Sequence, residues 1–184
     1  MSALPRVSLL LLTAALAGCG GLDAIAGKKP ALPESQQPPR AVPIRLHAAA
    51  KLNVDAQGRP LALVARVYKL RQNAAFEAAP YAAFLNPAAE KEAFGADVIE
   101  VKDLTLVPGQ RYETIEKVSR EAGYVGIVAL FHSPAPQRWR MAFAAPDAEK
   151  TGLTVGLHAC ALSAGLGAKP TVAEVKTPGS ARCQ

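Results

Sequence analysis

Residues 41–54 read AVPIRLHAAAKLNV, and this stretch decides the fold class of the 184-residue chain. Apolar residues occupy the even positions from Val42 to Val54, and most of the polar residues stand between them. A period of two over this length predicts a β-strand with one buried face. Residues 55–60, DAQGRP, then have the composition of a turn, so we expect the chain to reverse there into a second strand.

Similar patterns, bounded by Gly, Pro and Ser, recur along the rest of the chain. We expect further strands over residues 61–70, 98–107, 111–118, 124–131, 139–143 and 153–161, with 171–176 as a candidate eighth. An apparent change of phase near Lys102–Asp103 predicts a β-bulge. The Ala-rich segment 73–94, with prolines at positions 80 and 87, predicts two short helices. The sequence therefore predicts an all-β, two-sheet β-sandwich of seven to eight strands, with a short helical insertion after the second strand.

The composition limits the classes of function. Lys and Arg number 21 against 15 Asp and Glu, which gives a formal net charge of +6. No run of five or six like charges occurs, so an arm that binds nucleic acid is disfavoured. The length suits a single domain with tails.

The N-terminus has the layout of an export signal. Arg6 precedes the apolar run 7–17, which is about half the ~20 residues needed to cross a bilayer. The run ends in Leu16, Ala17, Gly18 and Cys19, which resembles a bacterial lipobox. That resemblance implies a diacylglyceryl group on the Cys19 sulfur, cleavage before Cys19 and acylation of its new amine. An ordinary signal peptide with a chance cysteine is the alternative.

The predicted organisation has three parts: a signal peptide over 1–18, a lipidated cysteine and Pro-rich tether over 19–43, and a β-sandwich domain over 44–184. Lipoproteins kept in the inner membrane often carry Asp directly after the cysteine, whereas this chain has Gly20. We therefore expect the periplasmic face of the outer membrane of a Gram-negative cell. As a flexible coil the tether would span about 25–30 Å, either as a leash or as a stretch without a role of its own.

No pattern in the sequence indicates catalysis. The three histidines, His47, His132 and His158, lie far apart and have no second ligand at metal-binding spacing. Each is interpreted as a solvent-facing residue. No nucleophile motif or phosphate-binding loop occurs. We expect neither an enzyme nor a metal site.

Two cysteines remain once Cys19 is modified. In the oxidising periplasm Cys160 and Cys183 have each other as partners, which predicts one intramolecular disulfide. Two separate thiols, or a disulfide between molecules, are the alternatives.

Several short motifs follow Cys19 in a fixed order. They are Asn53 with Gly58-Arg59-Pro60, Val67-Tyr68-Lys69-Leu70, Phe76, Gly95-Ala96-Asp97, Leu106-Val107-Pro108-Gly109, the run from Gly126 to Phe131, and Trp139-Arg140. Each motif is weak alone. In this order, over residues 44–145, they resemble the TssJ (VasD/SciN) family of type VI secretion lipoproteins.

The resemblance implies a transthyretin-like β-sandwich in the trans-envelope complex, with no cofactor beyond the covalent lipid. In that family the lipoprotein binds the periplasmic region of TssM, the IcmF-type inner-membrane protein, and ties it to the outer membrane through the loop after the first strand. Carried onto this chain, the loop contains Asn53, Asp55, Gln57, Gly58, Arg59 and Pro60. We expect Asp55, Gln57 and Arg59 to be exposed, and interpret Gly58 and Pro60 first as turn residues. A periplasmic lipoprotein that binds a small ligand, or supports another envelope machine, is the alternative function.

Overall fold

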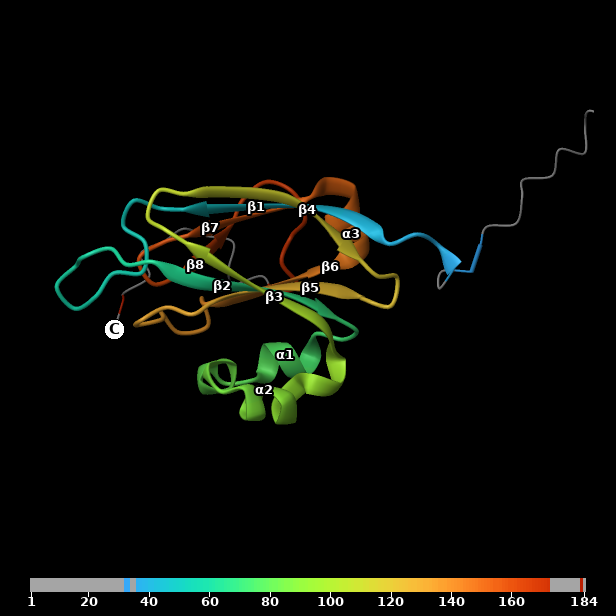
Figure 1. Cartoon of the computed structure of the whole chain (residues 1–184), viewed down its shortest axis with the longest axis horizontal. Helices are drawn as coiled ribbons and strands as arrows, with labels where there is room; N and C mark the ends of the chain where they lie inside the picture. Colours follow the sequence, from blue (N-terminus) through green and yellow to red (C-terminus); the bar gives the residue numbers. More distant parts are fainter. Residues whose placement is uncertain (1–31, 34–35, 173–182, 184) are drawn as a thin grey trace, which may run out of the picture. The chain divides into compact units, whose positions relative to one another are not determined.

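The computed structural model describes residues 32–33, 36–172 and 183 (Figure 1). The chain divides into two units, Met1–Leu32 and Pro33–Gln184, and every helix and strand described belongs to the second. In chain order these elements are β1 (Arg40–Ala48), β2 (Leu63–Leu70), α1 (Ala74–Ala78), η3 (Tyr81–Leu85), α2 (Pro87–Phe94), η4 (Gly95–Asp97), β3 (Val98–Leu106), β4 (Arg111–Val118), β5 (Tyr124–Ala129), β6 (Arg140–Ala144), α3 (Ala145–Thr151), β7 (Leu153–Leu157) and β8 (Leu162–Ala164).

The strands form two four-stranded sheets, ordered β4-β1-β7-β8 and β3-β2-β5-β6. All neighbours are antiparallel except β1 and β7, which are parallel. The apolar positions of the opening stretch face the core, since Val42, Ile44 and Leu46 are fully buried. The predicted two-sheet β-sandwich is confirmed, and the arrangement is consistent with a transthyretin-like fold.

Strand β1 differs from its expected limits at both ends. It begins at Arg40, within the predicted tether, and Pro43 lies inside it. Proline is accommodated because pairing with β7 begins only at Ile44, so Pro43 has a neighbouring strand on one side alone. The strand ends at Ala48. Leu52 lies in the loop that follows, and its side chain is fully buried. The apolar residues of the loop therefore extended the alternating pattern beyond the end of the strand.

The predicted bulge is misplaced along β3. Pairing with β2 is regular at Lys102 and Asp103, and the register shifts where Leu70 pairs with Val98 and Lys69 with Glu100. The error came from the charge on Lys102, which suggested an outward side chain. Lys102 instead reaches towards β4, where its Nζ donates to Glu116 at 2.7 Å.

The helical insertion covers the outer face of the β3-β2-β5-β6 sheet (Figure 1). The Tyr68 ring of β2 meets three aromatic rings of the insertion, Phe76, Phe84 and Phe94, with centroids 5.4–6.1 Å apart. All four side chains are buried. Arg66 adds a polar contact, with its Nη1 2.9 Å from Glu90 Oε2. The predicted segment 73–94 therefore forms helices. It contains three short helices, α1, η3 and α2, where two were expected.

The last third of the chain departs most from expectation. Residues 145–151 form helix α3, which was not predicted, and β7 ends at Leu157 rather than at residue 161. The next strand is β8, over residues 162–164. The candidate strand 171–176 lies mostly outside the described residues. Of its start, Thr171 is described and donates its N–H to Ala142 O at 2.8 Å.

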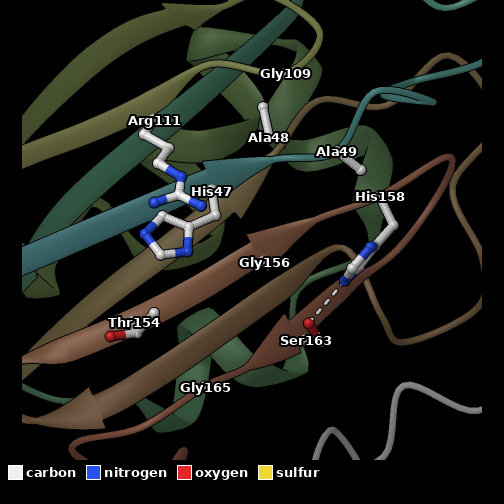
Figure 2. A pocket seen from close by; sticks show the side chains of 10 residues that line it. All are labelled: His47, Ala48, Ala49, Gly109, Arg111, Thr154, Gly156, His158, Ser163 and Gly165. Atoms are coloured by element: carbon white, nitrogen blue, oxygen red, sulfur yellow. Dashed lines mark hydrogen bonds between the residues drawn. The ribbon is translucent and has the colours of Figure 1, made fainter.

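The outer face of the β4-β1-β7-β8 sheet carries none of the described helices (Figure 1). Its side chains reach solvent, as Ile115 does with 68% of its surface exposed. A hollow of about 450 Å³ lies on this face, where β1 ends (Figure 2). This face is therefore open at the same end of the sandwich as the loop between β1 and β2.

Candidate functional site

Residues 49–62 connect β1 to β2, and the backbone fixes the first part of this loop to two other segments. Gly109 N, in the turn between β3 and β4, donates to Ala49 O at 3.1 Å. Asn53 N donates to His158 O at 3.1 Å, and Val54 N donates to Ala159 O at 3.0 Å, both just after β7. The loop therefore starts from a base formed by three segments that are distant in sequence.

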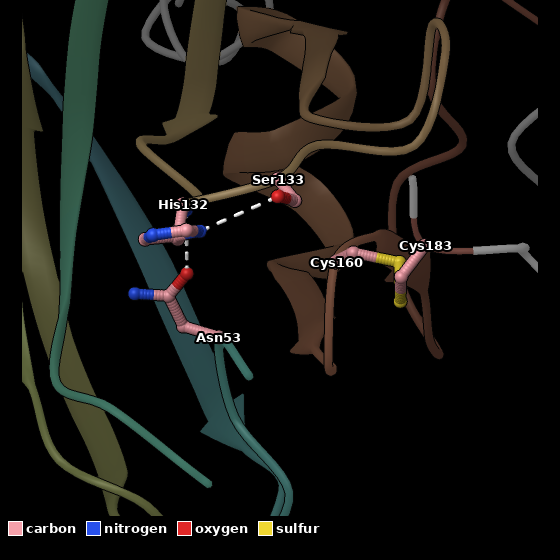
Figure 3. Close-up of a disulfide and its surroundings, with 5 residues drawn as sticks. All are labelled: Asn53, His132, Ser133, Cys160 and Cys183. Atoms are coloured by element: carbon pink, nitrogen blue, oxygen red, sulfur yellow. Dashed lines mark hydrogen bonds between the residues drawn. A yellow bond between two sulfur atoms is a disulfide. The ribbon is translucent and has the colours of Figure 1, made fainter. Parts of the chain in front are cut away.

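Asn53 is the main side chain of this base. It has a positive φ of 47° and is 6% exposed. Its Nδ2 donates to Ala62 O at 2.8 Å, and its Oδ1 accepts from His132 N at 2.7 Å (Figure 3). Asparagine tolerates the left-handed conformation better than most residues. The structure therefore places Asn53 under the loop, where it joins the two ends of the loop to the segment after β5.

Asp55 shapes the turn that follows. Its Oδ1 accepts from Gln57 N and Arg59 N, both at 2.9 Å, and its Oδ2 accepts from Arg59 Nε at 2.7 Å. These bonds, led by the one from Arg59 N, lower the pKa of Asp55 below its usual value. The side chain is 9% exposed, so the expectation of an exposed Asp55 is wrong: its carboxylate is used inside the turn.

The tip of the loop, Gln57 to Pro60, is exposed. Gly58 has a φ of +74°, and its N–H donates to Asp55 O at 2.9 Å, which supports its interpretation as a turn residue. Arg59 has 73% of its side chain exposed. The predicted loop residues thus fall into three groups. Asn53 is buried at the base, Asp55 bonds within the turn, and residues 57–60 form the exposed tip.

A disulfide joins Cys160 to Cys183, with Cα atoms 5.5 Å apart (Figure 3). Cys160 lies shortly after β7, next to Ala159, which receives the loop's N–H from Val54. Cys160 O also accepts from Ala135 N at 2.9 Å. The disulfide therefore lies at the same end of the sandwich as the loop.

The predicted lipidation site, Cys19, falls outside the described residues, as do its neighbours Leu16, Ala17 and Gly18. None of the helices in the described part is long and apolar enough to cross a membrane. Within the described ranges, no group of three or more His, Cys, Asp or Glu is arranged to hold a metal ion.

The histidines are less isolated than their spacing suggested. His132 is exposed in the segment after β5, whereas His47 and His158 line one hollow together with Arg111 (Figure 2). The alternation in β1 indicated that His47 faces outward, but only the pairing of β1 with β4 and β7 brings the three side chains to one place. The sequence contained no local signal for this cluster.

Comparison with solved structures shows where this fold occurs. The chain is similar to the T6SS lipoprotein TssJ1 from Pseudomonas aeruginosa, at 29% identity and a TM-score of 0.61, over 73% of this chain and 100% of that one. It is also similar to a chain described as "Type VI membrane complex", at 25% identity and a TM-score of 0.63, over 68% and 98% of the two chains. A third similar chain is described as the T6SS protein TssM C-terminal domain (869-1107) from EAEC, at 25% identity and a TM-score of 0.58, over 68% and 97%.

No curated protein sequence matches the chain significantly. The pattern of one family matches residues 40–160, which is most of the folded unit. That family is described as type VI secretion lipoprotein, VasD, EvfM, TssJ, and it is a family of structural lipoproteins without known cofactors. The chain therefore belongs to the type VI secretion lipoprotein family.

Proposed function

We propose that this protein is the outer-membrane lipoprotein of a type VI secretion trans-envelope complex, and that it binds the periplasmic region of TssM and tethers it to the outer membrane. Membership of the family supports a role in the secretion membrane complex. Similarity to a chain described as the T6SS protein TssM C-terminal domain supports TssM as the partner. Lipid on Cys19 would supply the attachment, and several acyl chains are enough for stable anchoring.

The observation that carries the binding role is the construction of the β1–β2 loop. Asn53 fixes its base and Asp55 holds its turn, so the tip is presented in one conformation. A preorganised loop loses little conformational entropy on binding, which favours affinity. Gln57 and Arg59 are the exposed polar side chains of this tip, and we assign them the contact with TssM.

The position of the loop suits a tether. The chain enters the sandwich at Arg40, and the loop leaves the other end of the same nine-residue strand. At about 3.3 Å per residue, these two ends are ~30 Å apart. The segment that leads to the anchor therefore enters β1 at one end, and the partner-binding loop leaves it at the other. Confinement to one envelope compartment raises the effective concentration of both partners, so a moderate affinity suffices.

The test is binding of the purified TssM periplasmic region to the wild-type protein and to a Gln57→Ala/Arg59→Ala variant, measured by calorimetry. Asp55 is left unchanged because its carboxylate organises the turn. Loss of an exposed arginine contact at an interface should weaken binding about tenfold or more. Lys117→Ala is the matched control, since Lys117 is exposed and pairs with Ala41 where the chain enters β1.

The control variant is expected to bind as the wild type does. Equal affinities of the wild type and the loop variant would remove the loop tip from the interface. No binding by the wild-type protein would refute TssM as the partner.

A further inference from the structure

The hollow on the outer face of the β4-β1-β7-β8 sheet is lined by residues that take no part in the proposed loop contact. It lies across all four strands of this sheet and the segments next to them, with a volume of about 450 Å³. Its lining consists of His47, Ala48, Ala49, Gly109, Arg111, Thr154, Gly156, His158, Ser163 and Gly165 (Figure 2). Two histidines and one arginine are included, and the lining holds no carboxylate.

The basic side chains of this lining have unused hydrogen-bonding capacity. Arg111 and His47 are register partners on adjacent strands, and Figure 2 shows the guanidinium beside the imidazole ring. His47 Nε2 is buried and has no hydrogen-bond partner within the described part of the chain. Buried polar atoms are usually paired, so this ring nitrogen is available to bond to a ligand. The neighbouring guanidinium can only donate, which favours a ligand that accepts hydrogen bonds.

His158 and Ser163 form the opposite wall. His158 Nε2 lies 2.7 Å from Ser163 Oγ, which fixes the position of the hydroxyl. Burial, with a smaller contribution from the Arg138 charge, lowers the pKa of His158. The imidazole of His158 is therefore mostly neutral near pH 7, and Arg111 supplies the permanent positive charge.

Glycine keeps the floor of the hollow open. Gly156 pairs with His47 on one side and with Ser163 on the other. A Cβ at this position would lie 2.6 Å from Ser163 Oγ and 2.9 Å from His158 Nε2. Any side chain at residue 156 would therefore fill the space between the two walls.

The hollow is continuous with the base of the β1–β2 loop. Ala49 is both a lining residue and the first residue of the loop, and its carbonyl accepts from Gly109 N, which belongs to a second lining residue. His158 is a third lining residue, and its carbonyl accepts from Asn53 N at the base of the loop. A protein that binds the tip of the loop would need to extend only past this base to reach Arg111.

We propose that this hollow, with Arg111, His47 and Ser163, receives the carboxylate of an Asp or Glu side chain of the protein that docks on the β1–β2 loop. The proposal rests on the proposed function. A guanidinium offers parallel N–H donors that match the two oxygens of a carboxylate, and an imidazole N–H and a hydroxyl can complete the set. A metal ion fits less well, since the lining offers two histidines beside a permanent cation and no acidic ligand.

The test measures binding of the TssM periplasmic region to four full-domain proteins: wild type, Arg111→Ala, His47→Gln and Lys117→Ala. Loss of a charge-assisted hydrogen bond is expected to weaken binding about tenfold in Arg111→Ala, and His47→Gln should weaken it less. Lys117→Ala removes a charge from the same strand at its other end and should bind as the wild type does. If Arg111→Ala does not fold by circular dichroism, the His47→Gln result decides.

The outcomes separate the two proposals. If the Gln57→Ala/Arg59→Ala variant binds weakly while Arg111→Ala and His47→Gln bind like the wild type, the carboxylate site is refuted and the loop contact stands. If Arg111→Ala, His47→Gln and Lys117→Ala all weaken binding equally, the effect is general charge and the site is again refuted. If the wild type does not bind, the proposed function fails, and the role of the hollow fails with it.

Discussion

Asp55 accepts three hydrogen bonds within the β1–β2 loop, two from backbone N–H groups and one from Arg59 Nε. These bonds favour the ionised carboxylate and lower its pKa in the folded protein. A group with a lowered folded pKa stabilises the fold above its unfolded pKa, near 3.8, and this contribution is lost as the pH falls through the lower folded value. The turn should therefore stay ordered throughout the neutral and mildly acidic range.

We predict that the amide NMR signals of Gln57 and Arg59 keep their folded positions until the pH falls below 3.8. Their common midpoint reports protonation of Asp55, to which both N–H groups donate. In Asp55→Asn this acid transition should be absent from both signals. A midpoint at or above 3.8 would show that the turn does not stabilise the carboxylate.

The roles of single loop residues were only partly predictable. The Asp55 to Pro60 composition identified a turn, because Gly and Asp favour turns through their own backbone and side-chain chemistry. The amide of Asn53, however, bonds to a backbone N–H that is 79 residues away. No local pattern encodes such a contact, so sequence reasoning placed a buried anchor and an exposed tip in one group.

At the scale of elements, the sequence identified helices and strands whose ends are set by nearby residues, such as a proline or a capping side chain. Pro87 begins α2, and Asn86 caps it by accepting from Ala88 N at 2.9 Å, so this helix could be located from the sequence. Helix α3 has only seven residues, and β8 has only three. Elements this short have no measurable period, and they form because the surrounding strands hold them.

The disulfide acts on one element, the C-terminal tail, which it ties to the segment after β7. It closes a loop with a sequence separation of 23. In the chain-entropy model such a crosslink stabilises the folded state by about 3 kcal/mol, because it restricts the unfolded chain. We predict no free thiol in the unfolded, unreduced mature protein, as measured with a thiol reagent.

A Cys160→Ser/Cys183→Ser variant should lose about 3 kcal/mol of unfolding free energy in denaturant titrations. The matched control is the unfolding free energy of the wild type after reduction, compared with that of the oxidised wild type. Reduction breaks the disulfide but keeps both cysteine side chains. Two free thiols in the untreated protein would contradict the pairing.

At the scale of the whole molecule, β1 connects the features that matter most for the proposed role. It lies inside its sheet, paired with β4 from Arg40 to His47 and with β7 from Ile44 to Ala48. At its start, Arg40 is 3% exposed and its guanidinium donates to Ala122 O at 3.3 Å. At its end, the base of the loop is bonded to two other turns. Tension between an anchor and a bound partner would therefore run along a single strand that is held throughout its length.

This arrangement separates attachment from recognition, and Cys19→Ser tests the separation. Without the sulfur there is nowhere to add the diacylglyceryl group, so we predict that the variant moves from the membrane fraction to the soluble periplasmic fraction on cell fractionation. Because the loop and its base lie in the folded unit, the purified variant should still bind the TssM periplasmic region with wild-type affinity. The Gln57→Ala/Arg59→Ala variant should do the reverse, staying with the membranes while binding weakly. A Cys19→Ser protein that still partitions with membranes would show that another part of the chain holds it there.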